Sequence, residues 1–349
     1  MNSAERFLTA LRGGVPDRVP IFELYIHPKI IDTFVPGGGL PELVETLELD
    51  AISSFWMTDG TMSETPVDAE TTVDEWGVTW WHGEENKAPI DGPIRNLEDI
   101  KHYDPPDPDA PHRLKTFREY VPRFKGKKAV IYQARYGFSW AADLRRFENF
   151  MMDLLDNPRL AHELLDITND FAVRLVRNAV RAGADVIVFG DDIAFKTGLM
   201  VSPETFKEFL LPRLIRAVDA VKEEGALCIK HSDGNIWPIL DMLVETGIDG
   251  INPLEPVAGM DIGEVKRKYG DRFCLLGNID CGELLSHRST EEVKQTVKET
   301  IRVAAPGGGY IMASSNAIHS SVKPENYRAM IDATFQYGKY PLQLDKKTY

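Results

Sequence analysis

Residues 184–235 read ADVIVFGDDIAFKTGLMVSPETFKEFLLPRLIRAVDAVKEEGALCIKHSDGN. Two short apolar runs, at 184–190 and 226–231, flank a longer stretch whose apolar residues recur at helical spacing. Nearly continuous apolar runs are typical of strands buried on both faces, and apolar residues at i, i+3 and i+4 are typical of an amphipathic helix. This stretch therefore predicts a strand–helix–strand unit of a parallel α/β sheet.

The same alternation extends along the whole chain. Eight apolar runs predict strands, at 19–24, 49–55, 129–134, 184–190, 226–231, 248–253, 272–277 and 308–314. Helical patterns lie between most of them, and several begin with Ser, Asn or Asp and end at Gly. Eight strands alternating with helices fit a closed (β/α)₈ TIM barrel better than an open doubly wound sheet. We therefore expect residues 1–349 to form a single TIM barrel domain.

Residues 59–109 interrupt this repeat. They contain TTVDEWGVTWW at 71–81 and DPPDPDAP at 104–111, neither of which continues the strand–helix alternation. We interpret the stretch as an insertion after the second strand, forming a hairpin over the barrel mouth. Its tryptophans could line a substrate lid, but large aromatic side chains more often pack an insertion onto its own barrel.

Composition restricts the class of function. The chain is 43% apolar and 27% charged, which is typical of a soluble globular enzyme. Its formal net charge of −14 argues against general nucleic-acid binding, which needs a basic surface. The first residues, MNSAERFLTALRGG, lack the apolar region and cleavage site of a signal peptide, so we expect a cytoplasmic protein without membrane contact.

The run at 226–231 leads into His231, Asp233 and Gly234. In parallel α/β folds the loops at the carboxyl ends of the strands face the active site. His231 and Asp233 are two residues apart, so an extended backbone points both side chains the same way. Such pairs are also common as structural hydrogen bonds. The pair is nevertheless the first catalytic candidate, because of its place at a strand end.

Other strand ends supply further candidates. Asp191 and Asp192 follow the fourth run and could act as ligands or as a general acid, or could cap the next helix. Arg135 follows the third run and could meet a substrate carboxylate or form a structural ion pair. The substrate-binding candidates are Tyr25, His27, Trp56, Arg135, Tyr136, Asn278, Asp280, Asn316 and His319.

The order of motifs along the chain resembles the uroporphyrinogen decarboxylase superfamily. These motifs are RFLTALRGGVPDRVPIF, DEWG, VSPETFKEFLLPRL, KHSDGN, GINPLEP, YGDRFCLLGNID, GGYIMASSN and KPEN. The superfamily includes the decarboxylase and several corrinoid-linked methyltransferases. The resemblance covers nearly the whole chain and implies a TIM barrel, in agreement with the strand count.

Two departures from the decarboxylase pattern bear on the reaction. The decarboxylase holds its substrate carboxylates with an arginine-rich RQAGRY segment after the first strand, where this chain has FELYIHPK at 22–29. That stretch lacks the guanidinium groups suited to bidentate carboxylate binding. The essential aspartate of the decarboxylase lies in an FSD motif, where this chain has SSFWM at 53–57. Both departures disfavour porphyrinogen chemistry.

The thiol-activating methyltransferases of the superfamily carry HxCG where this chain has HSDG at 231–234, and a second cysteine where it has SSN at 314–316. The histidine is kept and both cysteines are absent. Nitrogen and carboxylate ligands leave zinc harder and more Lewis-acidic than thiolates do, which suits an oxygen substrate. The pattern therefore resembles the substrate-side methyltransferases of O-demethylase systems.

This resemblance implies transfer of a methyl group from a small methoxylated substrate to the corrinoid of a separate partner protein. Zinc held by His231, Asp233 and Glu255 would polarise the ether oxygen, with Asp192 and Asp191 as further catalytic candidates. The resemblance to the decarboxylase also favours a homodimer. Two alternatives stay open, namely a metal-free decarboxylase of a porphyrinogen or smaller acid, and a non-catalytic barrel that binds a corrinoid or another small ligand.

Overall fold

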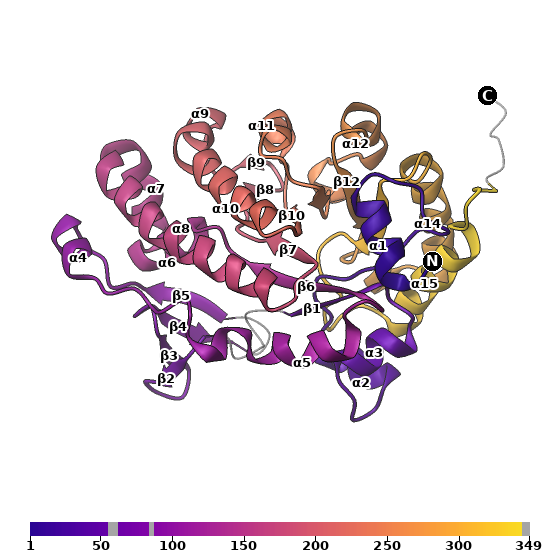
Figure 1. The fold of residues 1–349 in the computed structure, drawn as a ribbon, viewed down its shortest axis with the longest axis horizontal. Helices are drawn as coiled ribbons and strands as arrows, with labels where there is room; N and C mark the ends of the chain where they lie inside the picture. Colours follow the sequence, from indigo (N-terminus) through magenta and orange to yellow (C-terminus); the bar gives the residue numbers. More distant parts are fainter. Residues whose placement is uncertain (55–61, 84–86, 344–349) are drawn as a thin grey trace.

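A computed structural model describes residues 1–54, 62–83 and 87–343 of the chain. In it a parallel seven-stranded sheet curls into a TIM-barrel-like arrangement with helices outside it (Figure 1). In spatial order the strands are β1 (Ala51–Ser54), β6 (Ala129–Ala134), β7 (Val186–Phe189), β10 (Leu227–His231), β11 (Gly250–Asn252), β12 (Cys274–Ile279) and β13 (Tyr310–Ser314). Each of these strands lies on one of the apolar runs that predicted it.

The expected first strand, at 19–24, is the exception, because it forms only an isolated bridge between Ile21 and Met312. The Phe22 nitrogen donates to the Met312 oxygen (3.0 Å), and the Asp50 nitrogen donates to the Ile21 oxygen (2.9 Å). This segment is thus hydrogen bonded to both edges of the curled sheet. The Ile21 nitrogen donates to the Asp50 carboxylate (2.8 Å) instead of to a neighbouring strand, which keeps the segment irregular. The expectation of eight regular strands is therefore corrected to seven and a bridging segment.

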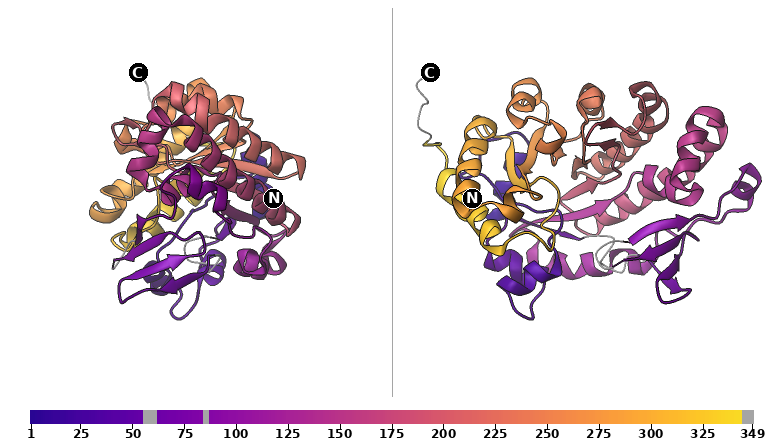
Figure 2. Two further views of the ribbon diagram at one scale, coloured as in Figure 1. Left: turned by 90° about the vertical axis from the view of Figure 1, so that its left-hand side faces the viewer. Right: turned by 180° about the vertical axis from the view of Figure 1, so that it is seen from behind.

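Most of the helices cover the outer face of the sheet (Figures 1 and 2). Their bounds are α1 (Ser3–Leu11), α2 (Pro28–Phe34), α3 (Leu40–Thr46), α4 (Leu97–His102), α5 (Lys115–Phe124), α6 (Phe138–Arg145), α7 (Phe147–Asp156), α8 (Pro158–Arg181), α9 (Pro203–Thr205), α10 (Leu211–Glu223), α11 (Leu240–Glu245), α12 (Ile262–Tyr269), α13 (Leu284–His287), α14 (Thr290–Ala304) and α15 (Pro324–Tyr337). α14 begins with a capping box between Ser289 and Glu292, as its sequence indicates. Among the described helices, none has the length and apolar character needed to cross a membrane.

The inner face of the curled sheet forms its own core. Ile131, Val188 and Ile229 pack there with Phe7 and Leu11 of α1. A methyl group on Gly250, the first residue of β11, would lie only 2.8 Å from a Leu11 methyl carbon, so α1 fills the amino-terminal end of the barrel. The polar side chains of the inner face are therefore left at the carboxyl ends of the strands.

The insertion is a four-stranded antiparallel sheet of β2 (Glu64–Pro66), β3 (Thr71–Asp74), β4 (Thr79–His82) and β5 (Lys87–Asp91). The expected single hairpin is therefore too small, because β2 and β5 pair on either side of β3 and β4. This sheet lies at the end of the molecule away from α14 and α15 (Figures 1 and 2). Trp76 is 1% exposed and stacks on Trp140 of α6 at 5.2 Å, and Trp80 is 3% exposed. Trp81, by contrast, is 42% exposed, so packing of the insertion onto the barrel involves the other two tryptophans.

Candidate functional site

His231 is the last residue of β10 and lies at the carboxyl end of the barrel. It follows Ile229 of the inner core by two residues, so its side chain lies on the same face of the strand. The side chain is almost fully buried, and its Nδ1 lies 2.6 Å from Oδ1 of Asn252 on the neighbouring β11. The imidazole is therefore fixed on one side by the adjacent strand.

The other ring nitrogen of His231 faces two carboxylates. Its Nε2 lies 3.7 Å from Oδ1 of Asp192 and 3.7 Å from Oδ1 of Asp233. Asp233 uses its second oxygen, Oδ2, to accept from the Asn316 amide. Its Oδ1 is buried and has no hydrogen-bond partner among the described residues. Asp192, His231 and Asp233 thus each offer one ligand atom, and these atoms lie within 4.8 Å of one another.

The loop after β10 is held by neighbouring backbone. Gly234 has φ +83°, and a side-chain carbon there would lie 2.6 Å from the Phe195 oxygen, so only glycine fits. Phe195 belongs to a small hairpin of β8 (Ala194–Phe195) and β9 (Gly198–Leu199), and its oxygen also accepts from the Asn235 nitrogen (2.9 Å). The Asp192 carboxylate accepts from the Asp233 nitrogen (3.0 Å). The loop that carries Asp192 and the loop that carries Asp233 are therefore bonded to each other.

Burial and charge act together at this site. Burial raises the pKa of Asp233 to about 6, and the carboxylates of Asp192 and Glu255 act in the same direction. Beside it, burial lowers the pKa of the Lys230 ammonium to about 8, although nearby carboxylates oppose this. Lys230 donates to the main-chain oxygens of Gly190 (2.7 Å), Asp191 and His231. The hydrogen bonds of the Lys230 ammonium thus go to the main chain and not to the carboxylates at the mouth of the barrel.

Asn252 and Lys230 are the residues that sequence reasoning missed. Asn252 is the last but one residue of the run at 248–253, and in the structure it pairs in register with His231. A polar residue near the end of a predicted strand was therefore a signal available in the sequence. Lys230 stands inside an apolar run, where a buried charge needs a partner. Each residue could be recognised in the sequence as a polar residue within an apolar run.

Two of the predicted residues on this side of the barrel stabilise backbone instead of joining the cluster. Asp191 accepts from the Tyr136 and Ser139 nitrogens (2.5 and 2.7 Å) and so caps the start of α6. Glu255, the expected third ligand, accepts from the Gly234 nitrogen (3.0 Å). It is absent from the group of converging ligand atoms, where Asp192 takes its place.

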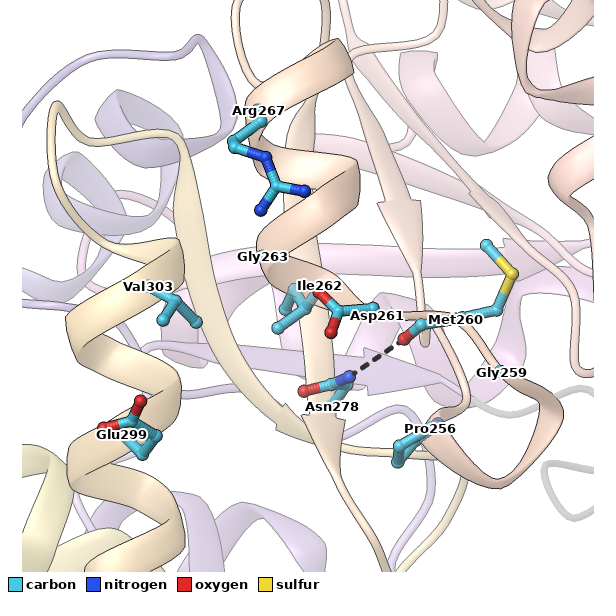
Figure 3. A pocket seen from close by; sticks show the side chains of 10 residues that line it. All are labelled: Pro256, Gly259, Met260, Asp261, Ile262, Gly263, Arg267, Asn278, Glu299 and Val303. Atoms are coloured by element: carbon cyan, nitrogen blue, oxygen red, sulfur yellow. Dashed lines mark hydrogen bonds between the residues drawn. The ribbon is translucent and has the colours of Figure 1, made fainter.

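Two predicted residues at the end of β12 also bond to nearby main-chain groups. Asp280 accepts from the nitrogens of Gly282, Glu283 and Leu284 (3.0–3.1 Å) and organises the start of α13. Asn278 donates to the oxygens of Leu254 and Met260 (3.0 and 3.5 Å). Figure 3 shows it in a cavity whose other lining residues come from α12, α14 and the loop before α12.

The remaining predicted residues have varied environments. Arg135 forms an ion pair with Asp143 (2.8 Å), which is the structural alternative to contact with a substrate carboxylate. Tyr136 is fully buried, and the Lys230 ammonium lies 5.4 Å from the centre of its ring. His27 caps α2 through its Nδ1. Tyr25 and His319 are half-buried on neighbouring segments, and Trp56 lies outside the described residues.

The cluster has the chemistry of a metal site. A separation of 3.7 Å is too long for a hydrogen bond between His231 and either carboxylate. Two ligands about 2.1 Å from a tetrahedral zinc ion lie roughly 3.4 Å apart, which is close to this separation. One histidine nitrogen and two carboxylate oxygens are also ligands that zinc accepts. A divalent cation would in addition offset the negative charge of the two aspartates.

Fold and site together define an α/β barrel protein with a candidate His–Asp–Asp centre at the carboxyl ends of its strands. A sequence model of the family described as uroporphyrinogen decarboxylase (URO-D) matches residues 2–337, and the chain belongs to this family. A uroporphyrinogen decarboxylase of Thioalkalivibrio sulfidiphilus is 24% identical over 96% of this chain and 98% of its own.

One further relative and one solved structure are methyltransferases. The methylcobamide:CoM methyltransferase MtaA of Methanosarcina barkeri is 30% identical over 56% of this chain and 55% of its own. A solved methyltransferase from Methanosarcina mazei aligns with a TM-score of 0.77 at 21% identity, covering 97% of this chain and 99% of its own. At that identity the match shows the shared fold, which confirms a TIM-barrel-like architecture.

Proposed function

We propose that this chain transfers a methyl group from a small methoxylated substrate to the corrinoid of a partner protein, with a zinc ion at the mouth of the barrel. The observation that carries this proposal is the convergence of Asp192, His231 and Asp233 ligand atoms within 4.8 Å. The buried and unpartnered Oδ1 of Asp233 is the sharpest part of it, because a buried oxygen without a partner costs free energy that a bound cation would recover.

The ligand types favour an oxygen substrate. Zinc bound by nitrogen and carboxylate would act as a Lewis acid toward an ether oxygen. In the proposed reaction the methyl–oxygen bond breaks, and the methyl carbon bonds to the cobalt(I) of the corrinoid, which supplies the electron pair. The electron pair of the broken bond stays on the leaving oxygen as an alkoxide or phenolate.

The chain's own residues set the direction of approach. The side chains of His231 and Asp233 are 10% and 26% exposed, whereas that of Asp192 is 44% exposed. The cluster therefore opens to solvent on the Asp192 side, where a substrate oxygen can approach. The backbone contacts of Gly234 hold the loop in place, so the two buried groups are positioned before any ligand arrives.

The relatives support both this proposal and its alternative. The name of the Methanosarcina barkeri relative specifies transfer between a methylcobamide and CoM, which fits corrinoid chemistry. The decarboxylases, however, match nearly the full chain, which keeps decarboxylation as the second candidate. Against it stands the segment at 22–29, which has no arginine. Its one lysine, Lys29, is a single point charge, so this segment does not offer the bidentate guanidinium groups that suit a polycarboxylate.

Metal content separates the two candidates. The protein and its His231→Ala variant are exposed to zinc, desalted and subjected to elemental analysis. We expect about one zinc per chain in the protein and none in the variant. The loaded protein should then form methylcobalamin from cob(I)alamin and a methoxylated aromatic, followed by absorbance. Absence of zinc from both proteins, with release of carbon dioxide from uroporphyrinogen, would establish the decarboxylase instead.

A further inference from the structure

We infer that Asn252 is a positioning residue that keeps the proton of His231 on Nδ1 and so leaves Nε2 free as a ligand. His231 and Asn252 are register partners at the ends of the parallel strands β10 and β11. The two residues are 8% and 3% exposed, and the His231 Nδ1 lies 2.6 Å from the Asn252 Oδ1. This contact is a short hydrogen bond in a nearly dry environment, where such bonds are strong.

The chemistry of the two groups fixes which atom carries the proton. An amide oxygen can only accept, so the proton of this hydrogen bond belongs to Nδ1 of His231. A neutral imidazole has one such proton, so Nε2 then carries a lone pair. That lone pair lies on the side of Asp192 and Asp233, each of whose Oδ1 atoms is 3.7 Å away. With the opposite tautomer, Nε2 would present a proton to the cluster and could not bind a metal.

The backbone of Asn252 also holds the segment that carries His231. The Asn252 main-chain oxygen accepts from the Ser232 nitrogen at 3.0 Å. The same residue therefore fixes both the ring and the backbone that follows it. Partners of this kind around metal-binding histidines set ring orientation, and their loss typically costs about 10–100-fold in metal affinity.

An amide suits this place better than a carboxylate does. The carboxylates of Asp192 and Glu255 already lie near that of Asp233, and the Lys230 ammonium donates to main-chain oxygens. A fourth carboxylate at position 252 would add negative charge to this cluster. Asparagine supplies the acceptor oxygen without adding charge.

The tautomer can be measured without metal, so this test does not depend on the proposed function, although the consequence for zinc does. Histidine labelled with ¹⁵N gives separate long-range correlations for the two tautomers, and His231→Ala identifies the signal of that ring among the eight histidines. At about pH 8.5 an ordinary imidazole is neutral. We expect the apo protein to carry the His231 proton on Nδ1. A proton on Nε2 would overturn the inference without any variant.

Variants sharpen the result. Asn252→Leu should move the proton to Nε2 in part or wholly and weaken zinc binding about 10–100-fold. Asn252→Asp keeps an acceptor and should restore the Nδ1 form. Asn278→Leu is the matched control, since it removes a buried asparagine from the next strand end and should leave the His231 signal unchanged.

The outcomes separate the inference from the proposed function. An unchanged tautomer in a folded Asn252→Leu protein contradicts the role of Asn252. A changed tautomer in a protein that never binds zinc supports the role of Asn252 and contradicts the zinc-dependent function.

Discussion

The carboxyl ends of β10 and β12 both carry polar side chains at the mouth of the barrel, yet they differ in what those side chains bind. After β10, His231 and Asp233 each keep one atom without a hydrogen bond to any residue that the structure describes, and these atoms face Asp192. After β12, Asn278 and Asp280 donate to or accept from nearby main-chain groups. A polar residue at a strand end is therefore a candidate ligand only when the local backbone leaves one of its atoms unused.

The largest effect is expected at the β10 end. Asp233→Asn should weaken zinc binding at least about 100-fold, since loss of a mere outer partner already costs 10–100-fold. Titration against a chelator of known affinity measures this. The apo variant should be at least as stable as the original at pH 7.5. Because the folded pKa of Asp233 is raised to about 6 from 3.8, its ionisation costs stability as the pH rises through that range. Zinc binding that survives the change would remove Asp233 from the cluster.

Glu23, beside the carboxyl end of β13, tests a buried carboxylate whose oxygens already accept hydrogen bonds. Burial raises the pKa of Glu23 to about 8 from 4.5, and both its oxygens accept from Ser314. The folded state thus holds the proton longer than the unfolded state does, and stability is lost as the pH rises from about 4.5 to 8. Glu23→Gln should therefore raise the free energy of unfolding by on the order of 2 kcal/mol at pH 8.5. At pH 4 the gain should vanish, as followed by urea melts, and an equal gain at both pH values would contradict the buried-acid assignment.

Asp192 tests whether the exposed member of the cluster contributes. Asp192→Asn keeps an oxygen that can accept from the Asp233 nitrogen but removes one negative charge. We expect a drop in zinc affinity of about tenfold, smaller than at the buried Asp233, because solvent screens a side chain that is 44% exposed. An effect as large as that of Asp233→Asn would mean that the two carboxylates contribute equally.

The smallest effect is expected at the β12 end. Asp280→Ala removes acceptors from three main-chain nitrogens at the start of α13 and should cost about 1 kcal/mol of stability, as loss of a helix cap does. Zinc affinity should not change. Thermal melts and zinc titration of the same sample measure both quantities. A clear loss of zinc binding in this variant would mean that the β12 end also contributes to the site, contrary to the comparison made above.

The sequence predicted the repeat of the barrel well, because buried strands and amphipathic helices leave patterns in apolar residues. It failed at residues 19–24, where the Asp50 side chain takes a hydrogen bond that a neighbouring strand would have provided. Apolar pattern cannot reveal a side chain that replaces a strand. The size of the insertion was also missed, since its strands are short and its two outer strands, β2 and β5, are mostly exposed.

The candidate site was predicted in part for a different reason. Asp192, His231 and Asp233 could be proposed from their places at strand ends. Residue type alone did not show that Asp192 would join the cluster and Asp191 would not. The difference depends on which carboxylate accepts from nearby main-chain nitrogens, as Asp191 does. The same limit applies to Glu255, which accepts from the Gly234 nitrogen. Local backbone geometry decides which carboxylates remain available, and it is not visible in the sequence.

The place where the segment at 19–24 meets β13 has a consequence for how the protein folds during synthesis. Glu23 and Ser314 meet there although they are 291 residues apart in the chain. During translation the amino-terminal segment leaves the ribosome early and has no partner on that side until β13 has followed it. Contacts at such separation form late and slowly. The nascent chain therefore carries an open edge until β13 has been synthesised, and the barrel can close only after that strand has emerged.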